Sequence, residues 1–259
     1  MKIKTIYFSP TGNTKKTVKA VAEGMYGEVS GIDLTMLFKR KKKYNLDSVD
    51  LVIVGVPVYG GRIPQLLKSS ISHLDLKGKR AVAIVTYGNR EYDDALLELS
   101  DMLHEAGCDV IAAAAVIGEH SFTSEVGKGR PDREDCRELI SFGERICEKM
   151  VQVENGKVYE ELSIKGNHPY KDLPTSTDEY GPETTEACTR CGICSNLCPT
   201  GAISGTNQSL VAADKCIHCF ACVKNCPVMA KHFTVPQVDT IRNRLETNCK
   251  TNKKMELYI

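Results

Sequence analysis

Eight of the twelve cysteines in this chain fall into two copies of one spacing, and no other feature restricts its possible folds as strongly. Each copy reads Cys-x-x-Cys-x-x-Cys-x-x-x-Cys-Pro, and the copies begin 28 residues apart, at positions 188 and 216. Three closely spaced thiolates followed by a Cys-Pro pair are the ligand pattern of [4Fe–4S] clusters. The sequence therefore predicts two such clusters. The first copy contains Cys188, Cys191, Cys194 and Cys198, and the second contains Cys216, Cys219, Cys222 and Cys226.

In paired runs of this kind, the fourth cysteine of each run binds the cluster of the other run. Structural zinc uses two separated cysteine pairs or a Cys/His mixture, which this spacing does not match. Disulfides need an oxidising compartment, and nothing in the sequence indicates export. His218 lies between two of the cysteines and is expected beside a cluster or at the surface rather than as a ligand. The expected ligand sets are Cys188, Cys191, Cys194 and Cys226 for cluster I, and Cys216, Cys219, Cys222 and Cys198 for cluster II.

Length and composition narrow the remaining possibilities. The 259 residues are enough for two modest domains, and 34 basic residues against 33 acidic ones give no case for nucleic acid or a membrane surface as the main partner. No apolar run approaches the length of a membrane span, and residues 1–10 read as a strand rather than as a signal peptide. Many thiols without an export signal indicate the reducing cytoplasm, and the clusters favour the low oxygen of an anaerobe.

A run of five basic residues at positions 39–43 has two interpretations. The favoured one is a solvated loop, since charge runs usually face water. The alternative is a docking patch for an acidic redox partner, which opposite charge would attract.

The first 150 residues alternate apolar runs with helical patterns, which predicts an α/β fold with a doubly wound, five-stranded parallel sheet. The run at 51–56 is fully apolar, as a strand covered on both faces requires. The expected strands are 3–8, 51–56, 80–86 and 110–117, and the expected helices are 13–26, 92–106 and 133–150.

The turn after the first strand carries a cluster of hydroxyl, amide and glycine residues at the start of a helix. Backbone N–H groups, the helix dipole and hydroxyl donors together make such a turn a phosphate-binding site. It lacks the lysine of a Walker loop and the glycine spacing of a dinucleotide-binding motif, and hydroxyl residues also cap ordinary helices. The residues are Ser9, Pro10, Thr11, Gly12, Asn13 and Thr14.

This arrangement resembles the flavodoxin family, in which the phosphate of flavin mononucleotide (FMN) sits in such a loop. Two further loops follow later strands at the carboxyl edge of the sheet, where α/β folds bind ligands. The resemblance implies that they enclose the flavin ring. It assigns FMN to Ser9, Thr11, Gly12, Asn13 and Thr14, to Pro57, Val58, Tyr59, Gly60 and Gly61, and to Thr86, Tyr87, Gly88, Asn89 and Tyr92.

The chain departs from that family at two points. Many flavodoxins stack a tryptophan on the flavin, but this chain has none; Asn89 takes the aligned position, which leaves Tyr59, Tyr87 or Tyr92 to cover the ring. Arg62 stands where an acid is common, and a positive charge near the ring would raise the flavin potential.

The cysteine-rich part resembles a bacterial two-cluster ferredoxin, and the whole chain resembles prokaryotic fusions of a flavodoxin-like domain with such a ferredoxin. We expect a flavodoxin-like domain at 1–152, a linker at 153–187, a ferredoxin domain at 188–235 and a tail at 236–259 that packs back onto one domain. Gly118–Phe122 is either a surface loop or a segment beside the flavin or the second domain, and His120 is its notable residue.

The function implied by both resemblances is electron transfer between FMN and two [4Fe–4S] clusters, with single electrons relayed to or from a redox protein partner. Either direction of flow is compatible with the sequence. The alternative is a flavin-dependent reductase of a small acceptor such as a quinone or nitro compound, fed through the clusters. No glycine-rich nicotinamide motif follows a strand, which disfavours it, and whether the chain is an enzyme stays open.

Overall fold

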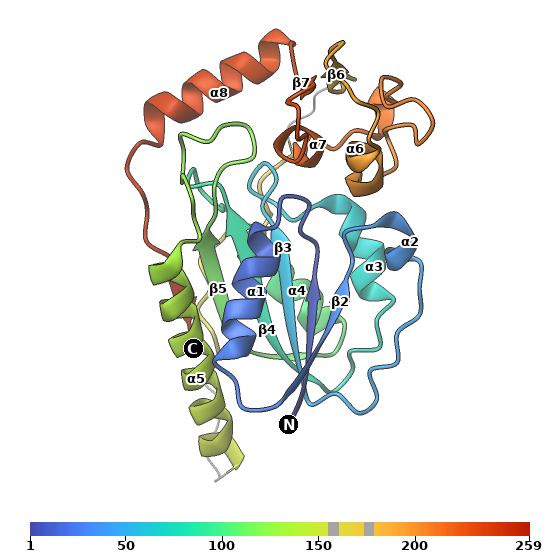
Figure 1. Cartoon of the computed structure of the whole chain (residues 1–259). Helices are drawn as coiled ribbons and strands as arrows, with labels where there is room; N and C mark the ends of the chain where they lie inside the picture. The colour runs from blue at the N-terminus through green and yellow to red at the C-terminus, as the bar shows by residue number, and fades with distance from the viewer. Residues whose placement is uncertain (155–160, 174–178) are drawn as a thin grey trace.

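The computed structural model describes residues 1–154, 161–173 and 179–259, and its largest part is a six-stranded sheet in the order β2-β1-β3-β4-β5-β8 (Figure 1). The five strands of the N-terminal part are parallel, which confirms the predicted fold class. A sixth strand, β8, comes from the C-terminal tail and pairs antiparallel with β5. The strands are β1 (Lys2–Tyr7), β2 (Glu28–Asp33), β3 (Leu51–Pro57), β4 (Arg80–Tyr87), β5 (Asp109–Ile117) and β8 (Glu256–Tyr258).

Helices cover both faces of the sheet, which is why β3, β4 and β5 are apolar along almost their whole length and buried. Helices α1 and α5 share one face. Gly24, directly after α1, lets them approach closely, because a Cβ at that position would lie 1.9 Å from the carbonyl oxygen of Ile140. Helix α4 packs on the opposite face against β4 and β5. The helices of this domain are α1 (Asn13–Glu23), α2 (Leu37–Arg40), η1 (Gln65–Leu67), α3 (Lys68–Ser72), α4 (Ala95–Glu105) and α5 (Arg133–Glu154).

The cysteine-rich domain is small and has little regular structure. It lies over the carboxyl ends of the parallel strands, the edge at which the sequence predicts cofactor loops (Figure 1). Strands β6 and β7 pair antiparallel, with Thr184 opposite Lys231. Its elements are β6 (Glu183–Thr184), α6 (Ile193–Leu197), η2 (Ala213–Lys215), α7 (Ala221–Lys224) and β7 (Lys231–His232).

Two segments join this domain to the sheet. Residues 161–173 run along α4, where the Asp94 carboxylate accepts hydrogen bonds from the amides of Asn167 (2.8 Å) and Lys171 (2.6 Å). After β7, helix α8 (Pro236–Asn248) leads to a stretch that descends beside the sheet to β8. The tail thus contacts the α/β domain by strand pairing. In the described part of the chain, no helix has the length and apolar character to span a membrane.

Candidate functional site

The turn between β1 and α1 has the backbone of an anion-binding loop. Gly12 has a φ of 94°, a conformation that favours glycine, and a Cβ there would meet no atom within 4 Å. Gly12 is the N-cap residue of α1 and supplies no side-chain cap. Ser9 has a structural role here, because its Oγ accepts a hydrogen bond from the Lys15 amide (2.9 Å). Thr14 is buried at the start of α1.

The loops after β3 and β4 lie next to each other and to this turn. The Val58 amide donates to the carbonyl of Thr86 (2.9 Å), and Gly60 and Gly61 both have positive φ values, 64° and 90°. A Cβ on Gly118 would lie 2.8 Å from Asn13 Nδ2, so the end of β5 closes on the same place. The structure therefore brings three predicted flavin loops together at one edge of the sheet.

One buried polar atom at this edge of the sheet has no hydrogen-bond partner in the described residues. The hydroxyl of Thr86 is buried, and no group in the described ranges accepts from it or donates to it. Native proteins seldom leave such a group unsatisfied. A ligand with polar ring atoms, such as FMN, would supply a partner here, and the donors of the β1–α1 turn suit its phosphate. The residues at this edge fit the predicted cofactor.

The C-terminal tail engages the side chains of two residues that are predicted to contact the flavin. The Asn89 amide group donates to the carbonyls of Cys249 and Thr251 (both 3.0 Å) and accepts from the Lys253 amide (2.8 Å). Tyr92 is fully buried, and its hydroxyl bonds Glu256 (2.6 Å). Neither side chain is left to cover a flavin ring.

Arg62 also differs from the expectation that it faces the flavin. Its guanidinium forms two hydrogen bonds of 2.8 Å with the buried carboxylate of Glu98 and stacks on the Tyr170 ring, 4.7 Å from the centroid. Burial raises the pKa of Glu98, but hydrogen bonds from Arg62, Lys68 and the Ile63 amide outweigh it and hold that pKa below its usual value. Arg62 therefore fastens α4 and the connecting segment to the loop after β3.

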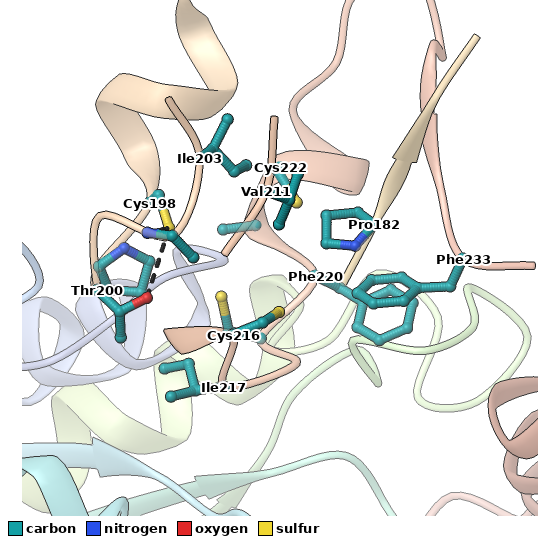
Figure 2. A pocket seen from close by; sticks show the side chains of 14 residues that line it. Pro182, Cys198, Thr200, Ile203, Val211, Cys216, Ile217, Phe220, Cys222 and Phe233 are labelled. Carbon is teal, nitrogen blue, oxygen red and sulfur yellow. Dashed lines mark hydrogen bonds between the residues drawn. The ribbon is translucent and has the colours of Figure 1, made fainter. Parts of the chain in front are cut away.

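The first cysteine cavity is lined by the four cysteines expected to bind cluster II (Figure 2). Cys198 comes from the first run and meets the three close cysteines of the second run. Apolar groups form most of the remaining wall, and the rings of Phe220 and Phe233 stack along one side with centroids 4.4 Å apart. The sulfurs belong to Cys198, Cys216, Cys219 and Cys222.

The second cavity is lined by the complementary set of cysteines. Cys226 joins the three close cysteines of the first run, and Cys191 is exposed at its rim. Lys231 and Gln208 also line this cavity. The crossing of Cys198 and Cys226 between the runs is the arrangement that two clusters with shared runs require. The sulfurs belong to Cys188, Cys191, Cys194 and Cys226.

The chemistry of these donor sets suits iron–sulfur clusters. Backbone amides point at sulfur: the Ala202 amide lies 3.2 Å from Cys198 Sγ, and the Ala230 amide lies 3.1 Å from Cys226 Sγ. Burial raises the pKa of the Cys219 and Cys222 thiols to about 12, so these sulfurs become thiolates only when a cation replaces the proton. Such amide–sulfur bonds also tune cluster potentials.

The cluster II cavity faces the predicted flavin loops. Ile217, in its wall, packs against the core of the α/β domain. Burial and then the neighbouring Cys219 sulfur raise the pKa of Tyr59 well above its usual value, which places the phenol in the electrostatic range of a cluster II ligand. Arg40 Nη2 donates to the carbonyl of Pro199 (2.5 Å), so one member of the basic run contacts the other domain instead of water.

The loop after β5 completes this junction. Glu119 pairs with Lys224 (2.6 Å), and Phe122 contacts Phe220 with ring centroids 4.3 Å apart. His120 accepts a hydrogen bond from the Phe122 amide at Nδ1 (3.1 Å), and its ring fills the space beside Gly88. Of the alternatives left open for Gly118–Phe122, these contacts favour the position beside the second domain.

Sequence reasoning missed two residues of this junction, Lys224 and Ile217. The cysteine pattern specifies neither, and each acts through a contact with a distant segment. The aromatic residue directly after a ligand cysteine, Phe220, is the one local sign that a cluster wall extends toward a neighbour.

Comparisons with known proteins agree with these two parts of the chain. A family model described as a flavodoxin domain matches residues 5–107, and one described as a 4Fe-4S dicluster domain matches residues 183–227. One similar solved structure is an archaeal flavodoxin, with 20% identity, 58% of this chain and 99% of that chain covered, and a TM-score of 0.43. Another is flavodoxin 1 from Bacillus cereus, with 20% identity, 57% of this chain and 98% of that chain covered, and a TM-score of 0.44. Rubredoxin oxygen:oxidoreductase from Desulfovibrio gigas is also similar (16%, 60% and 37%, TM-score 0.43). A search of curated proteins finds no match.

Proposed function

The chain is a fusion of a flavodoxin domain with a 4Fe-4S dicluster domain, and from this premise we propose that it relays single electrons between FMN, two [4Fe–4S] clusters and a redox protein partner. Both domain types support electron transfer in general. The proposal adds the order of the centres: FMN next to cluster II, cluster II next to cluster I, and cluster I next to the partner.

One observation carries this order. The cavity with Cys219 adjoins the flavin loops, because Ile217 packs on the flavodoxin core and Tyr59 lies in the electrostatic range of Cys219. Electron transfer rates fall steeply with distance, so the centre nearest the flavin is its partner. Tyr59, Gly60 and Thr86 would hold FMN at this junction, with the turn at Gly12 binding its phosphate.

The cluster I cavity supports the other end of the relay. Cys191 is exposed, and the two residues after Pro227 expose apolar side chains, with relative accessibilities of 37% for Val228 and 84% for Met229. An exposed ligand surrounded by apolar surface is a suitable point for brief contact with a redox protein. The partner would exchange electrons here, in either direction.

The residues of the chain bind and shield the centres, while the cofactors supply the redox chemistry: FMN exchanges one or two electrons and each cluster exchanges one. Apolar groups such as Ile203 and Val211 exclude water from the cluster II cavity. The ion pair between Glu119 and Lys224 and the ring contact of Phe122 keep the two domains in register.

The test begins with an anaerobic assay of iron, sulfide and flavin per chain. We expect about eight irons and one FMN. Laser-flash reduction of the flavin should then be followed by bleaching of cluster absorbance at a rate independent of protein concentration, because the transfer is intramolecular. Iron without FMN, even after FMN is added, would contradict the proposal.

Two cysteine variants test the order of the centres. Cys191→Ala should remove cluster I and leave FMN and the fast flavin-linked bleaching of cluster II; Cys219→Ala should abolish that bleaching. Retention of about eight irons by Cys191→Ala would contradict the ligand sets. Saturable reduction of a quinone that is lost from a flavin-free variant would instead favour the small-acceptor reductase.

A further inference from the structure

Lys231 is a buried lysine beside the cluster I cavity. It belongs to β7, five residues after Cys226, and only 3% of it is exposed. Its side chain lines the cavity together with the four cluster I sulfurs. The ammonium Nζ donates to the main-chain carbonyl of Gln208 at 2.6 Å.

No carboxylate balances this charge. In the described ranges 1–154, 161–173 and 179–259, no Asp or Glu oxygen lies within 4.0 Å of Lys231 Nζ, whereas other half-buried cations such as Arg62 and Lys224 each pair with an acid. Burial of an unpaired ammonium is unfavourable, so buried charges are normally paired. A carbonyl dipole alone does not offset a full charge.

The thiolates supply the opposite charge. Lys231 lines the cluster I cavity together with Cys188, Cys191, Cys194 and Cys226 and is not part of the lining of the cluster II cavity. These four cysteines would bind a cluster as thiolates, so their negative charge would lie in the same cavity wall as the ammonium.

We infer that Lys231 is a positioning residue whose fixed positive charge stabilises the anionic clusters and raises their reduction potentials, that of cluster I most. The inference rests on the proposed cluster binding. A [4Fe–4S] core with four thiolates carries net negative charge, which grows when an electron arrives, so a nearby cation favours the reduced form. Because Lys231 lines the cluster I cavity, it favours residence of the electron on cluster I, where the partner is proposed to dock.

Three substitutions separate charge from packing. Lys231→Gln keeps a hydrogen-bond donor for the Gln208 carbonyl and removes the charge, Lys231→Met removes both, and Lys231→Arg keeps both. Lys215→Gln is the matched control, since Lys215 directly precedes the ligand Cys216 but is exposed to solvent, where water and salt screen its charge.

The experiment is a potentiometric titration of each anaerobically purified full-length variant, followed by electron paramagnetic resonance, after iron and FMN have been counted. We expect Lys231→Gln and Lys231→Met to lower the midpoint of the higher-potential cluster step, Lys231→Arg to stay near the wild type, and Lys215→Gln to show no change. Loss of cluster I iron from the Gln and Met variants but not from Arg would equally support a required charge.

Two results would overturn the inference. One is a Lys231→Gln variant with full iron and unchanged midpoints. The other is equal loss of cluster I iron from the Gln, Met and Arg variants, which would assign Lys231 to packing of β7. Failure of the proposed function itself looks different, because the wild-type chain would then lack the clusters before any substitution is made.

Discussion

The ring of Phe122 in the loop after β5 lies 4.3 Å, centroid to centroid, from the ring of Phe220, which directly follows Cys219, a proposed ligand of cluster II. Phe220 in turn stacks on Phe233 at 4.4 Å, and Phe233 packs at 6.0 Å against Tyr180. A loop of the flavodoxin domain therefore inserts its aromatic side chain into an aromatic group of the dicluster domain. This contact ties the position of the cluster II wall to the loop that lies beside the flavin edge.

Phe122→Ala should weaken this junction by about 1 kcal/mol, the usual value of an aromatic pair beyond its buried area. The expected results are earlier cleavage of the chain by protease and slower bleaching of cluster absorbance after flavin reduction. Phe38→Ala is the control, since Phe38 is 57% exposed and lies outside the junction. Equal effects of the two substitutions would show that the ring contact does not hold the domains together.

Asn89→Gly should release the C-terminal tail. Asn89 has a φ of 57°, which glycine adopts without strain, so the substitution removes only the three hydrogen bonds to the tail. Unsatisfied partners typically cost about 1–3 kcal/mol. Hydrogen exchange of the β8 amides should accelerate, while FMN affinity stays unchanged. A large loss of FMN affinity with a protected β8 would return Asn89 to the flavin site.

His120 should make stability depend on pH. Burial, and then the charges of Lys224 and Arg90, lower the pKa of His120 to about 4 from its ordinary value of about 6.5. Between these values the unfolded chain binds a proton that the folded chain excludes, so stability falls as the pH drops from about 6.5 toward about 4. The loss between pH 7.5 and pH 5 should be about 2 kcal/mol.

His120→Gln removes that titration, so its unfolding midpoint in urea should vary less with pH over this range than that of the wild type. His73→Gln serves as the control because His73 is exposed on the surface. If the wild type and His120→Gln lose stability in parallel between pH 7.5 and pH 5, His120 is protonated in the folded chain as readily as in the unfolded one.

Thr14 should bind the FMN phosphate through its hydroxyl. Thr14→Val keeps the methyl group that packs toward Gly55 and removes the hydroxyl, so FMN affinity should fall by about 1 kcal/mol or more. Thr14→Ser keeps the hydroxyl and should bind FMN nearly as well as the wild type. Quenching of FMN fluorescence in a titration measures both affinities. Unchanged binding by Thr14→Val would remove this side chain from the site.

The fold was predictable from the sequence because its signals are local. The apolar runs at β3 and β4 and the helical patterns between them set a parallel sheet, and a parallel sheet places every loop after a strand at one edge. Strand β2 was harder to identify individually, since Glu28–Asp33 forms an exposed edge and lacks an apolar run. The cysteine spacing is local too, which is why it predicts two runs of ligands, and the structure gathers each predicted set around one cavity.

The side chains of Asn89, Tyr92 and Arg62 show what the sequence pattern leaves open. Each side chain lies at or near the predicted flavin edge in sequence, but its hydrogen bonds go to a segment far along the chain: the tail for Asn89 and Tyr92, and α4 for Arg62. Strand β8 has three residues, too few for a period-two pattern to predict it. A sequence pattern shows that a residue is polar or aromatic, and the tertiary fold decides which partner it meets.

Strand β8 belongs to the sheet but follows the dicluster domain in the chain. The dicluster domain is therefore topologically an insertion within the α/β domain and not an appendage to it. Asp94 fastens the segment that enters it, and Asn89 fastens the segment that leaves it. A domain attached at one end can rotate about one hinge, but a domain attached at both ends must break contacts on both sides to move away. The separation between the predicted flavin loops and the first cysteine cavity is therefore a property of the fold, and changing it would require rearrangement of both attachments.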